Sequence, residues 1–291
     1  MHIILTNPRG FCSGVKKAIQ DLNNALDQFG DPIYVYHEIV HNTWIVRHFQ
    51  GRGVRFVNSL DEVPNGAKLM FSAHGVAPCI RKQTEDRNIQ TFDATCPLVD
   101  RIHQSAIQYA KQGYRILLLG HRGHDEIVGI QGEAPDKITV VESEDEIRQL
   151  RCTENDKLAY LTQTTLSMRE THQRIELLRQ LFPQIEGPDN SNICFATQSR
   201  QDAVRKLVVK ADIVLVVGSR TSSNSRRLAD VAESLGVCSY LVDGPEDIAH
   251  GWFAGNETIV LTAGASAPES LVQDCVAVLK QRFNATSEES K

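Results

Sequence analysis

The chain has 291 residues, of which 41% are hydrophobic and 23% charged, and its formal net charge is −5. This composition is typical of a globular protein and excludes a collagen-like chain, a disordered chain and a small disulfide scaffold. The acidic balance also argues against nucleic-acid binding, which needs massed Lys and Arg, so we expect no nucleic-acid partner.

Short runs of apolar and β-branched residues alternate with longer amphipathic stretches along the chain. The short runs predict strands at Ile3–Thr6, Ile33–Tyr36, Val54–Val57, Leu69–Ser72, Ile116–Leu119, Ile138–Val141, Leu158–Leu161, Ile213–Val217, Ser239–Val242 and Thr258–Thr262. The amphipathic stretches predict helices at Gly14–Phe29, Thr43–Gly51, Leu98–Gln112, Met168–Leu181, Ala203–Ala211, Ser225–Leu235 and Pro268–Arg282. This alternation indicates an α/β fold with parallel sheets, whereas the polar residues 283–291 predict a disordered tail.

No targeting or membrane segment is visible in the sequence. The N-terminal residues lack the basic and apolar regions of a signal peptide. The longest apolar runs, such as Ile213–Val217, are far shorter than the ~20 residues of a membrane span. We therefore expect a cytoplasmic protein with no membrane partner, whose seven cysteines are reduced thiols.

One pattern recurs three times and begins each time with a cysteine that directly precedes a helix. The cysteines are Cys12, Cys96 and Cys194; a polar cluster, an acidic helix start and a second polar cluster follow each at similar distances. We predict three similar α/β lobes at residues 12–95, 96–193 and 194–282, with the strand of residues 2–7 closing onto the third. Ligands bind beyond the carboxyl ends of parallel strands, so a pseudo-threefold trefoil of lobes would bring the thiols and polar loops into one pocket.

Three thiolates that meet at one point favour a bound metal. The free N–H groups and the dipole of a helix stabilise a thiolate at its N-terminus. Three thiolates would repel one another unless a cation neutralised them, and three protein ligands leave a fourth position open. Thiolate ligation suits both iron–sulfur clusters and zinc, so the spacing leaves the metal open. A single cysteine is more often a buried small hydrophobe, and this is the expectation for Cys79, Cys152, Cys238 and Cys275.

The polar clusters carry the candidate ligand-binding residues. The first two repeats contain histidines, and the third contains hydroxyls and a carboxamide; the full set is His41, His74, His124, Ser222, Ser223, Asn224 and Ser266. Hydroxyls and carboxamides are weak metal ligands but good donors to phosphate, so anion binding explains this mixture better than metal binding. Glu126 has no equivalent in the other repeats and is a candidate proton donor. Each residue also has a purely structural explanation when it is considered alone. Ser222–Asn224 would be a helix N-cap, and the histidines and Glu126 would be exposed loop residues.

Several ordered segments together resemble the family of 4-hydroxy-3-methylbut-2-enyl diphosphate reductase, an enzyme of non-mevalonate isoprene biosynthesis. The segments are Gly10–Val15, Val40–Asn42, Ala73–Val76, Asp93–Pro97, Gly120–Glu126, Thr162–Ser167, Ser222–Ser225 and Gly264–Ser266. The resemblance extends from about residue 2 to residue 281, which is nearly the whole chain.

The resemblance implies an iron–sulfur oxidoreductase with a 4Fe–4S cluster at the centre of the three lobes. Cys12, Cys96 and Cys194 match its ligands, and one iron is left open for the substrate hydroxyl. The implied reaction is the reductive dehydroxylation of (E)-4-hydroxy-3-methylbut-2-enyl diphosphate to isopentenyl diphosphate and dimethylallyl diphosphate. It consumes two electrons and two protons and releases water. Reduced ferredoxin or flavodoxin would supply the electrons singly.

The resemblance also implies a role for each polar residue. Glu126 matches the acid that delivers protons, and Thr164 matches the hydroxyl that orients the substrate alcohol and relays protons to it. His124 matches a histidine on the diphosphate side. The other matches to diphosphate donors are His41, His74, Ser222, Ser223, Asn224 and Ser266.

Two other functions stay open on the residues alone. A zinc-dependent hydrolase would use the same three thiolates and an activated water, but it would be colourless, whereas a 4Fe–4S protein is brown. A non-catalytic iron–sulfur sensor would need neither Glu126 nor Thr164. The polar lining of the loops argues against a sensor.

Overall fold

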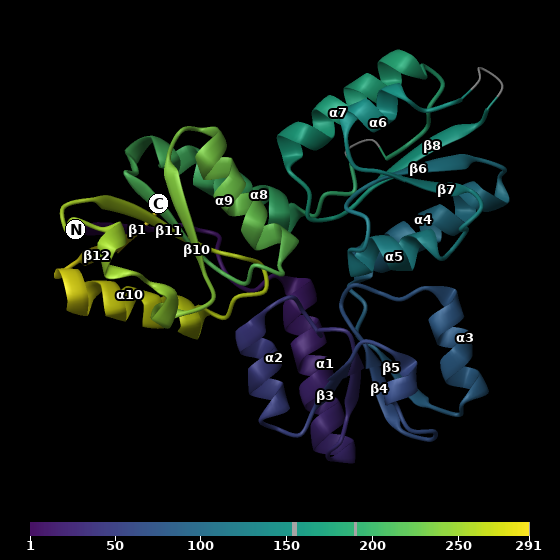
Figure 1. Cartoon of the computed structure of the whole chain (residues 1–291), viewed down its shortest axis with the longest axis horizontal. Coiled ribbons are helices and arrows are strands. Elements are labelled where there is room, and N and C mark those ends of the chain that lie inside the picture. Colours follow the sequence, from purple (N-terminus) through teal and green to yellow (C-terminus); the bar gives the residue numbers. More distant parts are fainter. Residues whose placement is uncertain (153–155, 189–190, 291) are drawn as a thin grey trace. The chain divides into compact units, whose positions relative to one another are not determined.

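The chain folds into three parallel sheets flanked by helices, which confirms the expected α/β class with three parallel-sheet lobes (Figure 1). The computed structural model describes residues 1–152, 156–188 and 191–290. Sheet A has the strand order β10 (Cys238–Val242), β9 (Ile213–Val217), β11 (Thr258–Ala263), β1 (His2–Leu5) and β12 (Thr286–Glu289). Sheet B has the order β3 (Arg55–Val57), β2 (Tyr34–Tyr36), β4 (Lys68–Phe71) and β5 (Gln90–Asp93). Sheet C has the order β7 (Ile138–Val141), β6 (Arg115–Leu119) and β8 (Leu158–Thr162).

The helices lie between the strands in chain order. The α-helices are α1 (Ser13–Phe29), α2 (Thr43–Gln50), α3 (Pro78–Asp86), α4 (Pro97–Lys111), α5 (Asp125–Gln131), α6 (Glu144–Arg148), α7 (Met168–Leu181), α8 (Phe195–Leu207), α9 (Ser223–Ser234) and α10 (Glu269–Phe283). Short 3₁₀ turns are η1 (Leu60–Glu62), η2 (Val208–Lys210), η3 (Pro245–Asp247) and η4 (His250–Trp252).

The chain divides into two compact units. The first contains residues 1–16, 41–48 and 195–291 and holds sheet A; the second contains residues 17–40 and 49–194 and holds sheets B and C. The expected lobes at residues 12–95 and 96–193 span the strands of sheets B and C, and the expected lobe at 194–282 spans β9, β10 and β11 of sheet A, where β1 pairs with β11. The lobe boundaries at 95/96 and 193/194 remain predictions.

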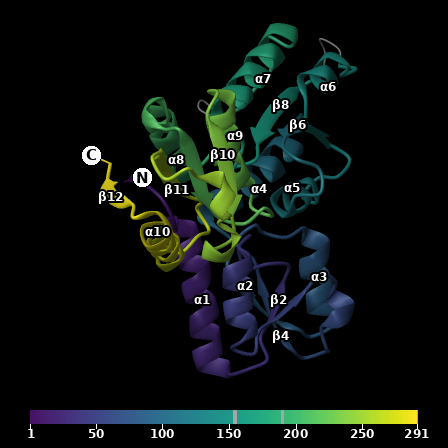
Figure 2. The ribbon, with the colours of Figure 1, turned by 60° about the vertical axis from the view of Figure 1, so that its left-hand side comes forward.

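The central strands β9, β11 and β1 of sheet A are buried on both faces, as their unbroken apolar sequences require. Ile3 and Leu261 pack with Leu271 of α10 on one face. Ile4 and Val214 pack with α8 and α9 on the other face. Figures 1 and 2 show α10 on the opposite side of the sheet from α8 and α9.

The chain end differs from the sequence prediction. Residues 283–291 were expected to be a disordered tail, but Thr286–Glu289 form β12, which pairs parallel with β1 in the register His2↔Thr286. The polar side chains of β12 are mostly exposed at the sheet edge, so backbone pairing rather than apolar burial holds this strand. Arg9 adds two bonds of 2.8 Å to Glu289. The prediction was wrong because the sequence of β12 has no apolar pattern that would indicate a strand.

Helix α8 also differs, because it begins at Phe195 rather than at the predicted Ala203. Its first turns bury polar side chains, so they lack the apolar period that predicts a helix. Arg200 is 4% exposed and donates to the carbonyl oxygens of Gly10 and Ala196. Tertiary hydrogen bonds thus replace the missing apolar face.

Sheet C positions three candidate residues of the second unit, namely His124, Glu126 and Thr164. One face packs on α4 and α5 through Ile102 and Ile127, and the other packs on α6 and α7 through Ile147 and Leu178. Because β6, β7 and β8 are parallel, their carboxyl-end loops leave from one edge of the sheet. The loop after β6 leads to His124 and Glu126, and the loop after β8 carries Thr164.

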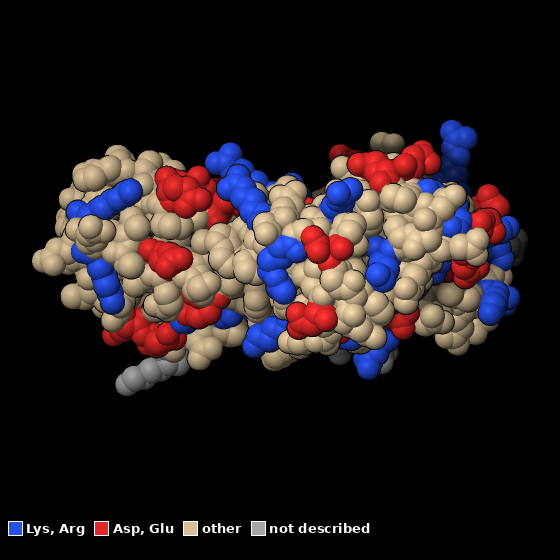
Figure 3. Space-filling model, turned by 90° about the horizontal axis from the view of Figure 1, so that it is seen from below, with Lys and Arg blue, Asp and Glu red and all other residues tan. Residues whose placement is uncertain are grey.

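The described residues contain no helix with the length and apolar character needed to cross a membrane. On the face seen in Figure 3, acidic and basic side chains are interspersed.

Candidate active site

Each of the three repeated cysteines directly precedes a helix, as the sequence predicts. Cys12 precedes α1, Cys96 is the N-cap residue of α4, and Cys194 precedes α8. The Val15 N–H group donates to Cys12 Sγ at 3.4 Å. All three side chains are half-buried thiols outside any disulfide. The Cys96 side chain makes no such cap bond, but all three thiols stand at the start of a helix, where the helix dipole favours a thiolate. Three such thiols are donors of the kind that an iron–sulfur group takes.

Two of the other cysteines differ in their surroundings. Cys275 is fully buried in α10, and burial, reinforced by Asp274, raises the pKa of its thiol to about 12. Burial also raises the pKa of Cys152. Both thiols are therefore disfavoured as thiolates. The burial expected for the four remaining cysteines is confirmed for Cys275 but is wrong for Cys79 and Cys238, which are exposed, and Cys152 is half-buried.

Glu126, Thr164 and His124 form one hydrogen-bonded group in the second unit. Glu126 is 1% exposed and lies in the first turn of α5. The Thr164 N–H group donates to Glu126 Oε1 at 2.7 Å, and the Thr164 hydroxyl donates to Glu126 Oε2 at 2.8 Å. His124 caps α5, and its Nδ1 accepts from the Glu126 N–H group at 3.2 Å. In a neutral His124 ring, Nε2 therefore carries the proton and is the donor.

His74 lies near this group, after the end of β4. Its ring stands at 86° to that of His124, with 6.0 Å between the ring centroids. His74 Nδ1 is 3.3 Å from Ser72 Oγ and 3.9 Å from Asp125 Oδ2. The other carboxylate oxygen of Asp125 is hydrogen-bonded to His37 Nδ1. The second unit thus brings the predicted His74 and His124 into ring contact, and it places His74 and His37 on the two oxygens of Asp125.

A buried histidine that the sequence did not reveal packs against these loops. His103 of α4 is 6% exposed, and its Nδ1 is paired with Glu133 Oε1 at 2.6 Å. A Cβ atom at Gly75 would lie 2.9 Å from His103 Nε2, and one at Gly129 would lie 3.3 Å from it. Gly75 also has φ +74°, which favours glycine. The His74 loop and α5 therefore approach each other around His103 only because both positions lack a side chain.

The serine cluster of the first unit forms a buried polar surface at the start of α9. Ser222 is the N-cap, and its hydroxyl accepts from the Ser225 N–H group at 3.2 Å. Ser223 Oγ and both polar side-chain atoms of Asn224 are buried, with no hydrogen-bond partner among the described residues. Buried polar atoms without partners are costly, so this cluster is suited to receive a polar ligand. The first turn of α9 carries no acidic residue that would repel an anion.

Ser266 and His41 meet in the same unit. Ser266 follows β11, and its hydroxyl donates to the His41 backbone oxygen at 2.8 Å. The chain near the serine cluster is tightly packed as well, since a Cβ atom at Gly264 would lie 2.0 Å from Ser225 Oγ. The first unit therefore orders the loop that carries His41 through Ser266.

The sequence did not assign roles to His37, Asp125 or His103. His37 and Asp125 belong to polar clusters that follow strands, which is the signal that could have found them. His103 stands at a helix position whose neighbours Val99, Ile102 and Ala106 are buried and apolar. A histidine on an apolar helix face was the signal available for it.

Fold and site define an α/β protein of three parallel sheets with half-buried thiols at helix N-termini and buried polar clusters at strand ends. Residues 3–280 match the family model described as LytB protein, and the chain belongs to this family.

Relatives with names agree with this membership. The chain is 51% identical over 286 residues to a 4-hydroxy-3-methylbut-2-enyl diphosphate reductase of Rhodopirellula baltica, covering 98% of this chain and 90% of the relative. It is 50% identical to the reductase of the same name from Pseudomonas aeruginosa, covering 97% of this chain and 91% of that one. The family resemblance inferred from the sequence segments is therefore confirmed.

Solved structures give the same result. The structure of E-1-hydroxy-2-methyl-but-2-enyl-4-diphosphate reductase from Plasmodium falciparum matches with a TM-score of 0.94 and 36% identity, over 99% of this chain and 92% of that one. A structure of (E)-4-hydroxy-3-methyl-but-2-enyl diphosphate reductase matches with a TM-score of 0.68 and 26% identity, over 97% of this chain and all of that one.

Proposed function

We propose that this chain reductively dehydroxylates (E)-4-hydroxy-3-methylbut-2-enyl diphosphate to isopentenyl diphosphate and dimethylallyl diphosphate. The carbon–oxygen bond of the alcohol breaks, two electrons and two protons enter, and water leaves. The observation that carries the proposal is the buried Glu126–Thr164 pair in a chain of the LytB family. His124 lies beside this pair, because its Nδ1 accepts from the Glu126 N–H group. A buried acid beside a hydroxyl is what protonation of a departing oxygen requires.

We assign Cys12, Cys96 and Cys194 as the three ligands of a 4Fe–4S cluster. Support comes from their equivalent positions before helices and from their half-buried thiols. When bound, such a cluster supplies electrons one at a time and an open iron that acts as a Lewis acid on the substrate hydroxyl. Family membership favours this cofactor over the zinc of a hydrolase, and the buried Glu126–Thr164 pair has no purpose in a sensor.

Glu126 holds the proton that the leaving oxygen needs. Its two oxygens face the N–H group and the hydroxyl of Thr164, so the carboxyl group has one fixed orientation. A protonated Glu126 Oε2 passes its proton to Thr164 Oγ while the Thr164 hydroxyl proton moves to the departing oxygen. Burial excludes the water that would otherwise compete for this proton.

We assign seven residues as donors to the diphosphate. Ser222, Ser223 and Asn224 offer hydroxyl and amide groups at the start of α9, where backbone N–H groups add further donors. His41, His74, His124 and Ser266 complete the assigned set. His124 Nε2 donates, because its Nδ1 is engaged with the Glu126 N–H group.

Reduced ferredoxin or flavodoxin is the assigned electron donor, and the cytoplasm is the assigned location. Both donors deliver electrons singly, which is how an iron–sulfur group takes them. The cysteines of the described chain are thiols, in keeping with a reducing compartment.

The test mixes anaerobically reconstituted protein with a reduced viologen dye and the hydroxylated diphosphate. Substrate-dependent dye oxidation, with both isoprenoid diphosphates among the products, is the expected result. A brown protein with an intact cluster spectrum that does not oxidise the dye would overturn the reductase assignment. A colourless protein that retains bound zinc would point to the hydrolase instead.

A further inference from the structure

The loop between β6 and α5 carries two of the residues that the proposed function uses. It comprises residues 120–124, ends with His124 and leads directly to Glu126. The loop contains two glycines. Gly123 has φ +80°, which favours glycine, and a Cβ atom at Gly120 would lie 2.2 Å from Ile127 Cδ1, so a larger residue would be crowded there. Because glycine retains more conformational freedom than other residues, this loop needs contacts that hold it in one conformation.

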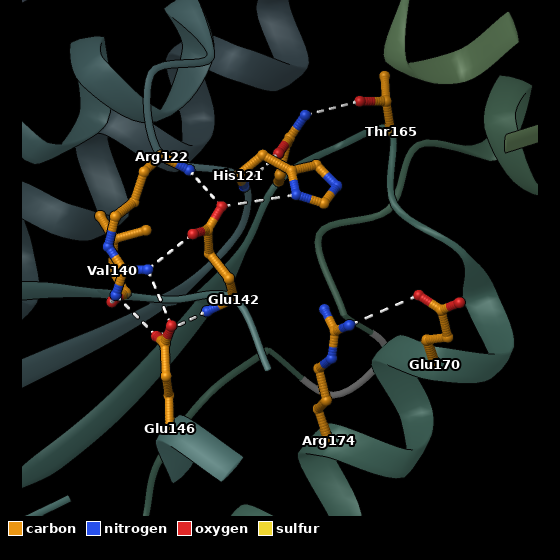
Figure 4. Close-up of polar contacts among 9 residues, drawn as sticks. His121, Arg122, Val140, Glu142, Glu146, Thr165, Glu170 and Arg174 are labelled. Carbon is orange, nitrogen blue, oxygen red and sulfur yellow. Dashed lines mark hydrogen bonds and ion pairs between the residues drawn. The ribbon is translucent and has the colours of Figure 1, made fainter. Parts of the chain in front are cut away.

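Arg122 supplies such contacts on the β7 side of the loop (Figure 4). Its Nη1 donates to Glu142 Oε2 at 2.7 Å and to Glu146 Oε1 at 2.9 Å. Its Nη2 donates to Glu146 Oε2 at 2.7 Å and to the Val140 carbonyl oxygen at 2.9 Å. The Arg122 N–H group donates to Glu142 Oε1 at 2.8 Å, so side chain and backbone are held by the same glutamate. The two glutamates are joined in turn, since the Glu142 N–H group donates to Glu146 Oε2 at 3.1 Å.

Gln163 holds the same loop on the β8 side. The His121 N–H group donates to Gln163 Oε1 at 3.0 Å, and Gln163 Nε2 donates to Thr165 Oγ1 at 3.0 Å. The residue between Gln163 and Thr165 is Thr164, which contacts Glu126. The loop is therefore fixed to both strands that flank β6, and one of the two attachments ends beside the Glu126–Thr164 pair.

The contacts of Arg122 are better suited to orienting the loop than to stabilising the fold. Its side chain is 51% exposed, and those of Glu142 and Glu146 are 33% and 36% exposed. Ion pairs at such exposure contribute little to stability because water screens them. The forked guanidinium, in contrast, fixes direction as well as distance when it binds a carboxylate through two nitrogens.

We propose that Arg122, held by Glu142 and Glu146, is a positioning residue that sets the loop of residues 120–124 so that His124 and Glu126 stand ready for substrate. The consequence for catalysis rests on the proposed function, whereas the effect on the loop does not. Arg122 touches neither substrate nor cofactor in this assignment and acts through the loop.

The variants that test this are Arg122→Ala, Arg122→Lys, Glu146→Gln and the double variant R122A/E146Q. The matched control is Arg148→Ala, which removes an equally exposed arginine that pairs only with Glu144 among the contacts described for it. In cluster-loaded enzyme we expect kcat of R122A to fall on the order of 10- to 100-fold, as for other small displacements of reacting groups. Arg122→Lys should recover part of this loss, because it keeps the charge but not the fork. The double variant should be no slower than R122A.

Hydrogen–deuterium exchange of the same proteins gives a readout that does not depend on activity. We expect faster exchange in peptides that cover residues 120–131 of R122A, with unchanged exchange elsewhere in sheet C, an unchanged melting temperature and a wild-type pattern in R148A. Unchanged exchange of the loop, an unchanged kcat, or faster exchange throughout sheet C would each overturn the positioning role. If the wild-type protein has no reductase activity, the proposed function fails while the exchange result alone still decides whether Arg122 holds the loop.

Discussion

Glu126→Gln is the substitution that separates proton delivery from every other function of the site. Glutamine has the shape of glutamate and keeps one oxygen for the Thr164 N–H group, which now donates to Glu126 Oε1 at 2.7 Å. The other oxygen becomes an NH₂ group, and the Thr164 hydroxyl, now a donor at 2.8 Å, can rotate to accept from it. Binding geometry is thus retained while the acid is lost.

The expected size of the effect follows from this geometry. General acid catalysis contributes about 10²–10⁴ in rate, so kcat should fall by that factor, or about 3–5 kcal/mol of transition-state stabilisation. Because both contacts to Thr164 can be kept, the exchange should cost no more than about 1 kcal/mol of folding stability, which leaves the protein folded. KM should change little, because Glu126 is not among the assigned diphosphate donors.

The assay follows viologen oxidation by cluster-loaded enzyme and checks the cluster by its visible absorption. Thr164→Val serves as a companion, since it removes the hydroxyl but keeps the N–H bond to Glu126 Oε1. Its kcat should also fall, whereas that of Thr164→Ser should stay close to wild type. An E126Q enzyme with wild-type kcat and an intact cluster would refute the assignment of Glu126 as the proton donor.

Three further predictions concern the thiols, the serine cluster and the charge network. Cys96→Ser should abolish the visible absorption of the reconstituted cluster, while Cys79→Ser, at an exposed cysteine, should retain it; a full cluster in C96S would remove Cys96 from the ligand set. Asn224→Ala should raise KM about 10-fold, as expected when a buried donor to an anion is lost, without lowering the melting temperature, because its buried polar atoms have no partner among the described residues; an unchanged KM would contradict its role. The hydrogen bond from Arg122 holds the pKa of Glu146 below its ordinary value, so this pair stabilises the fold above the ordinary pKa and loses that contribution as the pH falls through the lowered one. Water screens this exposed pair, so its contribution to stability is small, at most about 0.5 kcal/mol. Urea unfolding across that acidic range should show a slightly shallower loss of stability in Glu146→Gln than in wild type, and a steeper loss in the variant would contradict the assigned direction.

The sequence predicted best what depends on neighbouring residues and on strand order. Ten strands and most helices follow from apolar periodicity, and the placement of Cys12, Cys96 and Cys194 before helices follows from the repeat. The location of Glu126 and Thr164 at the carboxyl edge of one sheet follows from parallel topology. These properties are local or are set by the order of the elements.

What the sequence did not predict depends on contacts between distant residues. β12 forms because β1 offers an edge with which to pair, although its own residues are polar and mostly exposed. The pair of His103 and Glu133 requires a helix to approach two glycines closely, and neither residue gives any sign of its partner in the sequence. Hydrophobic periodicity carries no information on either event.

In sheet C, the sequence predicts which loops lie at the carboxyl edge of the strands, but it does not predict the hydrogen bonds between the side chains of those loops. Parallel pairing of β7, β6 and β8 brings three loops to one edge, and any polar residues there will be neighbours. Which of them bond depends on side-chain length: Arg122 spans from its own loop to Glu142 and Glu146, and a shorter side chain at that position would not. A residue that looks like an ordinary exposed arginine in the sequence is thereby tied to the loop that carries the proposed acid. The proposed catalytic residues are assigned by family resemblance, but the contacts that hold them in place follow from the geometry of this particular chain.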